Sequence, residues 1–89
     1  MSRYGSIDFT TDFMESFARK DLSVKDRRAI LKALELLDKD ERHPSLRLHA
    51  LVGELSGQWS ISASMELRIT FYRRREGRKE LVGCSRHYD

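Results

Sequence analysis

The residues best suited to chemistry are a histidine, a tyrosine and a distant arginine. The last residues of the sequence read CSRHYD and place His87 beside Tyr88, while Arg68 stands in a segment of alternating apolar and polar residues. A histidine titrates near neutral pH, so it can accept a proton from one hydroxyl or donate one to another. A guanidinium fits two phosphate oxygens and stabilises the charge that grows on phosphorus. On a shared surface, Arg68 and His87 suit RNA cleavage in which a ribose 2′-hydroxyl attacks the adjacent phosphate.

Strand register predicts such a shared surface. Apolar and polar residues alternate in 59–63 and again in 67–72, and the residues 64–66 between them predict a tight turn. Pairing the two segments across this turn places all their apolar side chains on one face, and a slip by one residue would bury serines instead. The opposite face then carries Ser62 beside Arg68.

A second hairpin extends the same surface. A two-residue turn at Glu76-Gly77 predicts the next set of strand pairs. These predicted pairs are Arg73 with Glu80, Phe71 with Val82, Ile69 with Cys84, Thr70 with Gly83 and Arg68 with Ser85. Glycine at position 83 is expected to open space above the middle strand. Continued alternation points His87 to the face of Arg68; it would turn Tyr88 to the other face, although twist of a terminal strand leaves the role of Tyr88 open.

Helical patterns precede these strands. Residues 3–9 predict a short opening strand, and the caps at 10–12 begin a helix with an apolar stripe through 13–18. A capping box at 23–26 opens a second helix that His43-Pro44 ends. Alternation through 46–51 then predicts the first strand of the main sheet. The predicted fold class is α+β: an N-terminal strand and a two-helix hairpin packed on an antiparallel sheet, in a single domain spanning residues 1–89.

Composition narrows the functional classes. Cys84 is the single cysteine, which rules out an internal disulfide and favours the cytoplasm. With one cysteine and three histidines the sequence has no zinc-ligand spacing, so we expect no metal and no cofactor. The sequence shows neither a signal peptide nor an apolar run of membrane-spanning length, so we expect no membrane association.

Positive charge is concentrated in the second half of the chain. Residues 1–45 carry nine Lys/Arg and nine Asp/Glu, whereas residues 46–89 carry eight Lys/Arg and five Asp/Glu, which accounts for the net charge of +3. Such asymmetry favours a polyanionic partner such as RNA, although a solvated basic face is an equally good interpretation. The residues predicted to bind RNA or the ribosome are Arg47, Arg73, Arg74, Arg75, Arg78, Lys79 and Arg86.

Several of these residues also have a purely structural interpretation. An exposed strand arginine or a terminal histidine is ordinarily a solvated side chain. His43 precedes proline and reads as a loop residue. Trp59 and Cys84 fall on the apolar face and are expected in the core.

Residues 43–89 resemble a known family. The motifs HPSLRLHALVGELSGQWSIS, MELRITFY and LVGCSRHYD are together similar to the RelE/ParE superfamily of bacterial toxin–antitoxin toxins. The segment LSGQWS, followed by an arginine-bearing strand and Cys-x-x-His-Tyr, looks most like the YoeB branch, whereas RLHALVGELSG looks more like the YafQ branch. The resemblance covers most of the chain, because the helical hairpin before the sheet also fits the superfamily fold.

Members of both branches are ribosome-dependent endoribonucleases that cut the codon held in the A site, and a cognate antitoxin neutralises each. The resemblance implies a metal-independent mRNA interferase of the bacterial cytoplasm. Its implied partners are an antitoxin, the ribosome and mRNA, together with operator DNA contacted through the antitoxin.

Residue by residue, the resemblance assigns Arg68 to the scissile phosphate and His87 to the general acid, with Tyr88 after it. His49 falls on a catalytic histidine of the YafQ type, and Glu66 falls on an acidic residue that this branch uses. His49 is the first choice for the general base and Glu66 the second.

Departures from both branches leave alternatives open. Ser62 stands where YafQ-like chains carry a second histidine, and no YoeB-type glutamate base stands near Arg47-Leu48. Aligning the C-terminal motif on Gly83 instead of Cys84 moves the terminal YafQ-type histidine to Ser85. Two other functions also stay open: a ParE-like toxin that inhibits DNA gyrase without cutting RNA, and an inactive member that binds an antitoxin or DNA.

Overall fold

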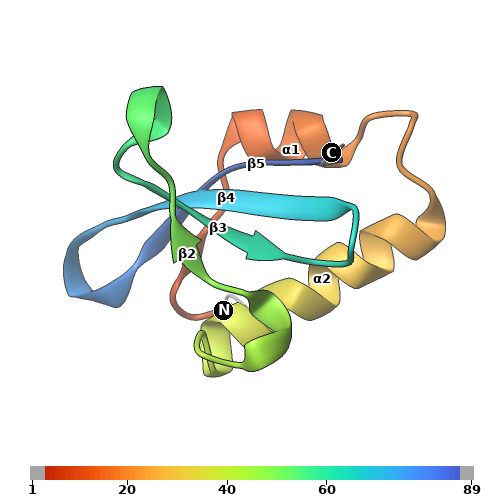
Figure 1. Cartoon of the computed structure of the whole chain (residues 1–89). Helices are drawn as coiled ribbons and strands as arrows, with labels where there is room; N and C mark the ends of the chain where they lie inside the picture. Colours follow the sequence, from red (N-terminus) through yellow and green to blue (C-terminus); the bar gives the residue numbers. More distant parts are fainter. Residues whose placement is uncertain (1–3, 87–89) are drawn as a thin grey trace.

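The computed structural model describes residues 4–86 and shows two helices packed against a five-stranded sheet (Figure 1). The main elements are β1 (Ile7–Asp8), α1 (Thr11–Phe17), α2 (Val24–Lys39), β2 (His49–Ala50), β3 (Gln58–Ser62), β4 (Leu67–Arg73) and β5 (Lys79–Arg86). Single 3₁₀ turns, η1 (Pro44–Leu46), η2 (Gly53–Leu55) and η3 (Arg75–Gly77), connect them. The predicted α+β class is confirmed.

Both helices begin where their capping residues predict. The side chain of Thr10 accepts a hydrogen bond from the Phe13 backbone N–H at the start of α1. At the start of α2, Ser23 and Asp26 form the predicted capping box, in which each side chain accepts a hydrogen bond from the other residue's backbone N–H. The buried stripe of α2 is Ile30, Ala33, Leu34 and Leu37.

The strand order is β1-β5-β4-β3-β2, so β5 lies inside the sheet (Figure 1). All neighbouring pairs are antiparallel except one: β1 runs parallel to β5, with Ile7 opposite Lys79. The expected wholly antiparallel sheet is therefore mixed. A two-residue strand carries too short a pattern to indicate its direction from sequence.

The predicted β3–β4 hairpin is confirmed residue for residue. Ile61 pairs with Ile69, and Ser62 pairs with Arg68. The Ala63 backbone N–H donates to the Leu67 carbonyl across the turn. The apolar side chains of both strands consequently face the helices, and the polar ones form the opposite face, called here the open face.

The predicted β4–β5 register is correct at one end and wrong at the other. Arg68 pairs with Ser85 and Ile69 with Cys84, as predicted, but Phe71 pairs with Leu81 and Arg73 with Lys79. A β-bulge between Thr70 and Phe71 produces this shift.

The bulge compensates for a longer turn. The Arg74 N–H donates to the Arg78 carbonyl, so the loop has three residues, and Glu76 and Gly77 both have positive φ. The predicted Phe71–Val82 and Arg73–Glu80 pairs are therefore absent. Leu81 takes the core position expected for Val82, and Leu81 and Cys84 are both buried although three positions apart.

The predicted strand over 46–51 is shorter than expected. Only His49 and Ala50 pair with β3, opposite Ser60 and Trp59. Leu46 instead ends η1 and is buried, and Arg47 adopts a left-handed backbone with a φ of 49°. A left-handed residue interrupts the alternation on which the prediction relied.

Helix α1 covers the part of the β5 edge that β1 leaves open. Thr10 Oγ1 donates to the Leu81 carbonyl at 2.8 Å, and Ser16 Oγ accepts from the Cys84 N–H at 3.0 Å. A Cβ added at Gly83 would be in van der Waals contact with Ser16 Oγ at 3.5 Å, so this position borders α1. The expected opening above the middle strand at Gly83 is corrected accordingly. Cys84 is a buried free thiol, as predicted.

The bulge leads to a stability prediction. We expect Leu81→Ala to lower the free energy of unfolding by about 2–5 kcal/mol, because a fully buried side chain leaves a cavity. Val82→Ala, the matched variant at a half-buried neighbouring position, is expected to cost clearly less. Urea denaturation measures both. A larger loss at Val82 would contradict the bulge and support the unbulged register.

Candidate active site on the open face

The open face carries polar residues from four strands. Strand register gathers Gln58, Ser60, Ser62, Arg68, Thr70, Tyr72, Glu80 and Ser85 there, with His49 at the β2 edge. Ser60 and Ser62 are buried in its floor, with 4% and 9% of their surfaces exposed. Small side chains here leave the longer Arg68 and His49 projecting from a polar surface.

The guanidinium of Arg68 is oriented by the β3–β4 turn. Its Nη1 donates to the carbonyl oxygens of Ser64, Met65 and Leu67 at 2.9, 3.0 and 3.1 Å. Within residues 4–86 no hydrogen bond from its Nε or Nη2 is found, so that edge of the guanidinium is available to a ligand. A donor fixed before substrate arrives suits stabilisation of a charge that forms during reaction.

His49 is exposed, and a backbone hydrogen bond fixes its tautomer. The Nδ1 atom lies 2.8 Å from the Arg47 carbonyl oxygen. A carbonyl only accepts, so Nδ1 carries the hydrogen and the neutral ring keeps its lone pair on Nε2. This geometry suits a base. The acceptor of this hydrogen bond is the carbonyl of Arg47, which has a left-handed backbone. Such backbone conformations cluster at functional sites.

His49 and Arg68 share the open face without touching. His49 pairs with Ser60, Ser60 with Thr70, and Arg68 lies one two-residue step from Thr70. Two strand spacings and one such step put the Cα atoms of His49 and Arg68 about 12 Å apart. Ser60 and Ser62, the buried serines of β3, lie between them along the sheet.

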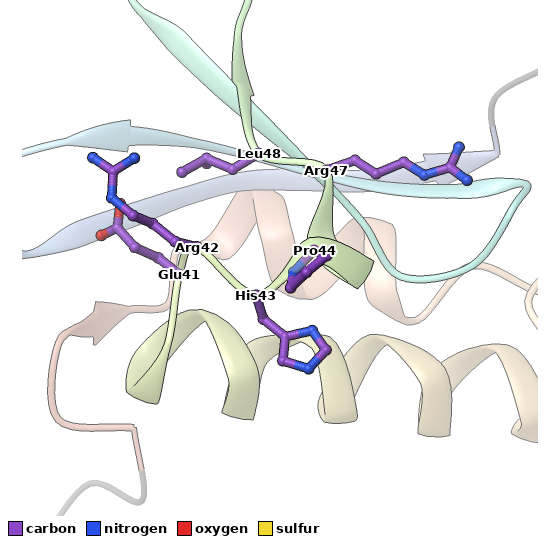
Figure 2. A pocket seen from close by; sticks show the side chains of 6 residues that line it. All are labelled: Glu41, Arg42, His43, Pro44, Arg47 and Leu48. Atoms are coloured by element: carbon purple, nitrogen blue, oxygen red, sulfur yellow. The ribbon is translucent and has the colours of Figure 1, made fainter.

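Beside Arg68, a shallow groove of about 450 Å³ runs along the β3–β4 turn. Its lining includes Arg47, Ser62 and Ser64. Arg47 and Arg42 both line the neighbouring hollow of about 220 Å³, and Figure 2 shows their side chains pointing away from one another. Arg47 thus brings a second positive charge to the end of the open face that holds Arg68.

Glu66 and Arg86, both predicted site residues, contact one another near α2. Arg86 Nη1 lies 2.9 Å from Glu66 Oε2, and its Nη2 lies 2.5 Å from Asp26 Oδ2. The backbone N–H of Ser23 and the charge of Arg86 both help to lower the pKa of Asp26. Arg86 therefore connects the end of β5 to the start of α2 through an ion pair.

Most basic residues of the β4–β5 hairpin are held by acids. Arg73 and Lys79 contact Glu41, Arg74 contacts Glu80, and Arg78 contacts Asp8. Arg73 also lies over the Trp59 ring, 4.5 Å from its centroid. Of the hairpin's five predicted RNA contacts, only Arg75 has no ion pair within the described part of the chain.

The structure leaves part of the predicted site untested and adds one residue to the open face. His87 and Tyr88 lie outside the described residues, so their roles stay predictions. Tyr72 was not among the predicted site residues, yet its parity with Arg68 along β4 places it on the open face. The even spacing of Arg68 and Tyr72 can be seen in the sequence, so Tyr72 could have been predicted. The acid partners of the basic residues could not have been predicted, because Glu41 and Asp8 come from distant segments.

Residues 4–86 contain no group of three or more His, Cys, Asp or Glu side chains arranged to bind a metal ion. None of their helices combines the length and apolar character needed to cross a membrane.

No family model and no curated protein matches the sequence. Solved structures do match the fold. A YoeB/ParE toxin from Agrobacterium tumefaciens has a TM-score of 0.72 and 20% identity over 93% of this chain and 99% of its own. YafQ from E. coli has a TM-score of 0.73 and 13% identity over 91% of each chain. The RelBE2 toxin–antitoxin complex from Mycobacterium tuberculosis has a TM-score of 0.62 and 19% identity over 92% of this chain and 96% of the matched one. The fold predicted by resemblance, that of RelE/ParE superfamily toxins, is therefore confirmed.

The Arg73–Glu41 pair predicts a pH dependence of stability. The hydrogen bond from Arg73, reinforced by its charge, lowers the pKa of Glu41 in the folded state. The pair therefore stabilises the fold above the unfolded pKa of Glu41, and this contribution is lost as pH falls through the folded pKa. We expect Glu41→Gln to cost about 1 kcal/mol near neutral pH and progressively less in acid.

Urea denaturation from about pH 7 to about pH 3 measures this difference. Glu54→Gln is the control, because Glu54 is exposed and takes part in no ion pair with other described residues. A Glu41→Gln cost that stays constant over this range would show that the carboxylate charge contributes nothing.

Proposed function

We propose that this chain is the toxin of a type II toxin–antitoxin pair and that it cleaves mRNA on the ribosome. The observation that carries this proposal is the open face, where strand register puts Arg68, with its oriented guanidinium, and His49, with a lone pair on Nε2, on one side of the sheet. The match to solved toxins of this fold supports the broader assignment. The low sequence identity leaves the reaction to be argued from the residues themselves.

The proposed reaction is a metal-independent transesterification. The ribose 2′-oxygen attacks the neighbouring phosphorus, the bond from phosphorus to the 5′-oxygen breaks, and a 2′,3′-cyclic phosphate and a 5′-hydroxyl form. Arg68 stabilises the extra negative charge on the phosphorane through the edge that its contacts with the turn leave available. The ribosome positions the codon, because the chain offers few groups of its own for proton transfer.

His49 is favoured over Glu66 as the general base that takes the 2′-proton. His49 is exposed, and its Nδ1–H···O bond leaves a lone pair on Nε2. Glu66 is already engaged by Arg86. For the opposite role we propose His87, which would give a proton to the leaving 5′-oxygen, and Tyr88 as its neighbour at the substrate.

The proposed partners follow from this function. An antitoxin protein is expected to neutralise the toxin, and a matched structure that is itself a toxin–antitoxin complex supports such a partner. Operator DNA would be contacted through the antitoxin. Arg47 and Arg75 are the basic residues we expect to meet ribosomal or messenger RNA most directly, because neither takes part in an ion pair with other described residues. The proposed location is the bacterial cytoplasm.

Translation extracts with intact ribosomes test the proposal. We expect wild-type protein to cut mRNA within codons, leaving a cyclic phosphate and a 5′-hydroxyl at the cut. Arg68→Ala is expected to reduce the single-turnover rate by roughly 100- to 1,000-fold, because it removes transition-state charge stabilisation. His49→Asn and His87→Ala are each expected to reduce it by roughly 100- to 10,000-fold, because each removes a proton-transfer group.

His43→Asn is the matched control for the histidine variants. The Nδ1 atom of His43 accepts from the Ser45 N–H and caps η1, so this side chain has a structural role. Its variant should cut mRNA at the wild-type rate. Intact mRNA together with trapped gyrase–DNA complexes would overturn the nuclease proposal in favour of a gyrase inhibitor.

A further inference from the structure

Tyr72 and Arg74 form a layered cluster on the open face. The guanidinium carbon of Arg74 lies over the Tyr72 ring, 4.7 Å from its centroid. The Tyr72 hydroxyl accepts a hydrogen bond from Gln58 Nε2 at 3.2 Å. Gly57 lies beside the ring, since a Cβ there would be in van der Waals contact with Tyr72 Cε1 at 3.9 Å. The ring is thus supported from β3 and lies under the guanidinium.

Glu80 fixes the plane of that guanidinium. Glu80 lies on the neighbouring strand, and its carboxylate accepts hydrogen bonds from Nη2 and Nε of Arg74 at 2.9 and 3.4 Å. Glu80 also balances the charge of Arg74, which makes this side chain a weak choice for gripping phosphate. Yet 52% of the Arg74 side chain remains exposed, so the stack ends in an oriented planar group at the surface.

Position links this stack to the proposed cleavage site. Tyr72 and Arg68 lie four residues apart on the same face of β4, which is about 13 Å along the strand. Thr70 is the one residue between them that shares this face. An RNA strand that places its scissile phosphate at Arg68 and continues along β4 therefore passes over Arg74.

We propose that Arg74, stacked on Tyr72 and oriented by Glu80, is a platform for an unpaired base of the mRNA next to the cut. Single-stranded RNA is commonly held by stacking its bases on aromatic rings and on arginine planes. This inference rests on the proposed function and adds a specificity-determining contact to it. Arg75, the next residue, has no such support and contacts RNA through its charge alone.

Paired changes in protein and RNA test the platform. The substrate is ribosome-bound mRNA in which each base of the A-site codon is removed in turn, leaving the ribose and phosphate intact. At one position, loss of the base is expected to lower wild-type kcat/KM by about 5- to 150-fold, the usual range for one stacked base. Arg74→Lys, which keeps the charge but loses the plane, should lower kcat/KM on intact mRNA similarly.

The two losses should not add. At the sensitive position, Arg74→Lys is expected to cut the abasic and the intact mRNA at the same rate, because the contact is already gone. Tyr72→Val should behave like Arg74→Lys, whereas Tyr72→Phe keeps the ring and should therefore retain the sensitivity of kcat/KM to loss of the base. Arg75→Lys is the matched control, and it should retain the full wild-type sensitivity to loss of the base. Circular dichroism checks folding, and Arg74→Lys with Tyr72→Phe decides the matter if Tyr72→Val is poorly folded.

The outcomes separate this inference from the proposed function. If wild-type protein cuts mRNA and Arg74→Lys keeps both the rate and the sensitivity to base loss, the platform is wrong and the nuclease stands. Additive losses likewise exclude a contact between Arg74 and the base. If wild-type protein leaves every ribosome-bound mRNA intact, the proposed function fails and the platform fails with it.

Discussion

The surface opposite the helices depends on one constraint, the pairing of β4 with the strands on either side. Ile61, Ile69 and Cys84 lie side by side across β3, β4 and β5, and all three are buried. A slip by one residue would exchange the two faces, burying arginine and serine while exposing the core. The apolar face thus fixes the polar one. The placement of Arg68 between Ser62 and Ser85 follows from core packing rather than from any contact on the open face itself.

This dependence explains which parts of the structure the sequence could predict. The β3–β4 hairpin was predictable because strict alternation and a short turn allow one register that buries every apolar residue. The segment from Leu81 to Gly83 allows either Leu81 or Val82 to face the core, and only the longer turn with its bulge decides between them. The prediction of a strand around Arg47 was wrong because Arg47 has a positive φ, which the alternation of apolar and polar side chains does not indicate.

Electrostatic partners were the least predictable part of the site. The sequence shows a basic hairpin, but the acids that hold it come from β1, the segment after α2 and β5 itself, namely Asp8, Glu41 and Glu80. These acids neutralise much of the charge that suggested RNA binding. The arginines that have no acid partner among the described residues include Arg47, Arg68 and Arg75, at opposite ends of the sheet. Positive potential is thereby divided between the candidate active site and the hairpin tip.

The strand order has a consequence for how the molecule comes into being. β5 is the last strand of the described residues yet lies between β1 and β4. A nascent polypeptide that has released only residues before 79 has no partner for β1, no edge for α1 to cover, and no Ser85 beside Arg68. Contacts between such distant segments form late in folding. The polar face is therefore completed only once β5 has emerged from the exit tunnel, and a nascent chain that has not reached this point carries an unfinished sheet.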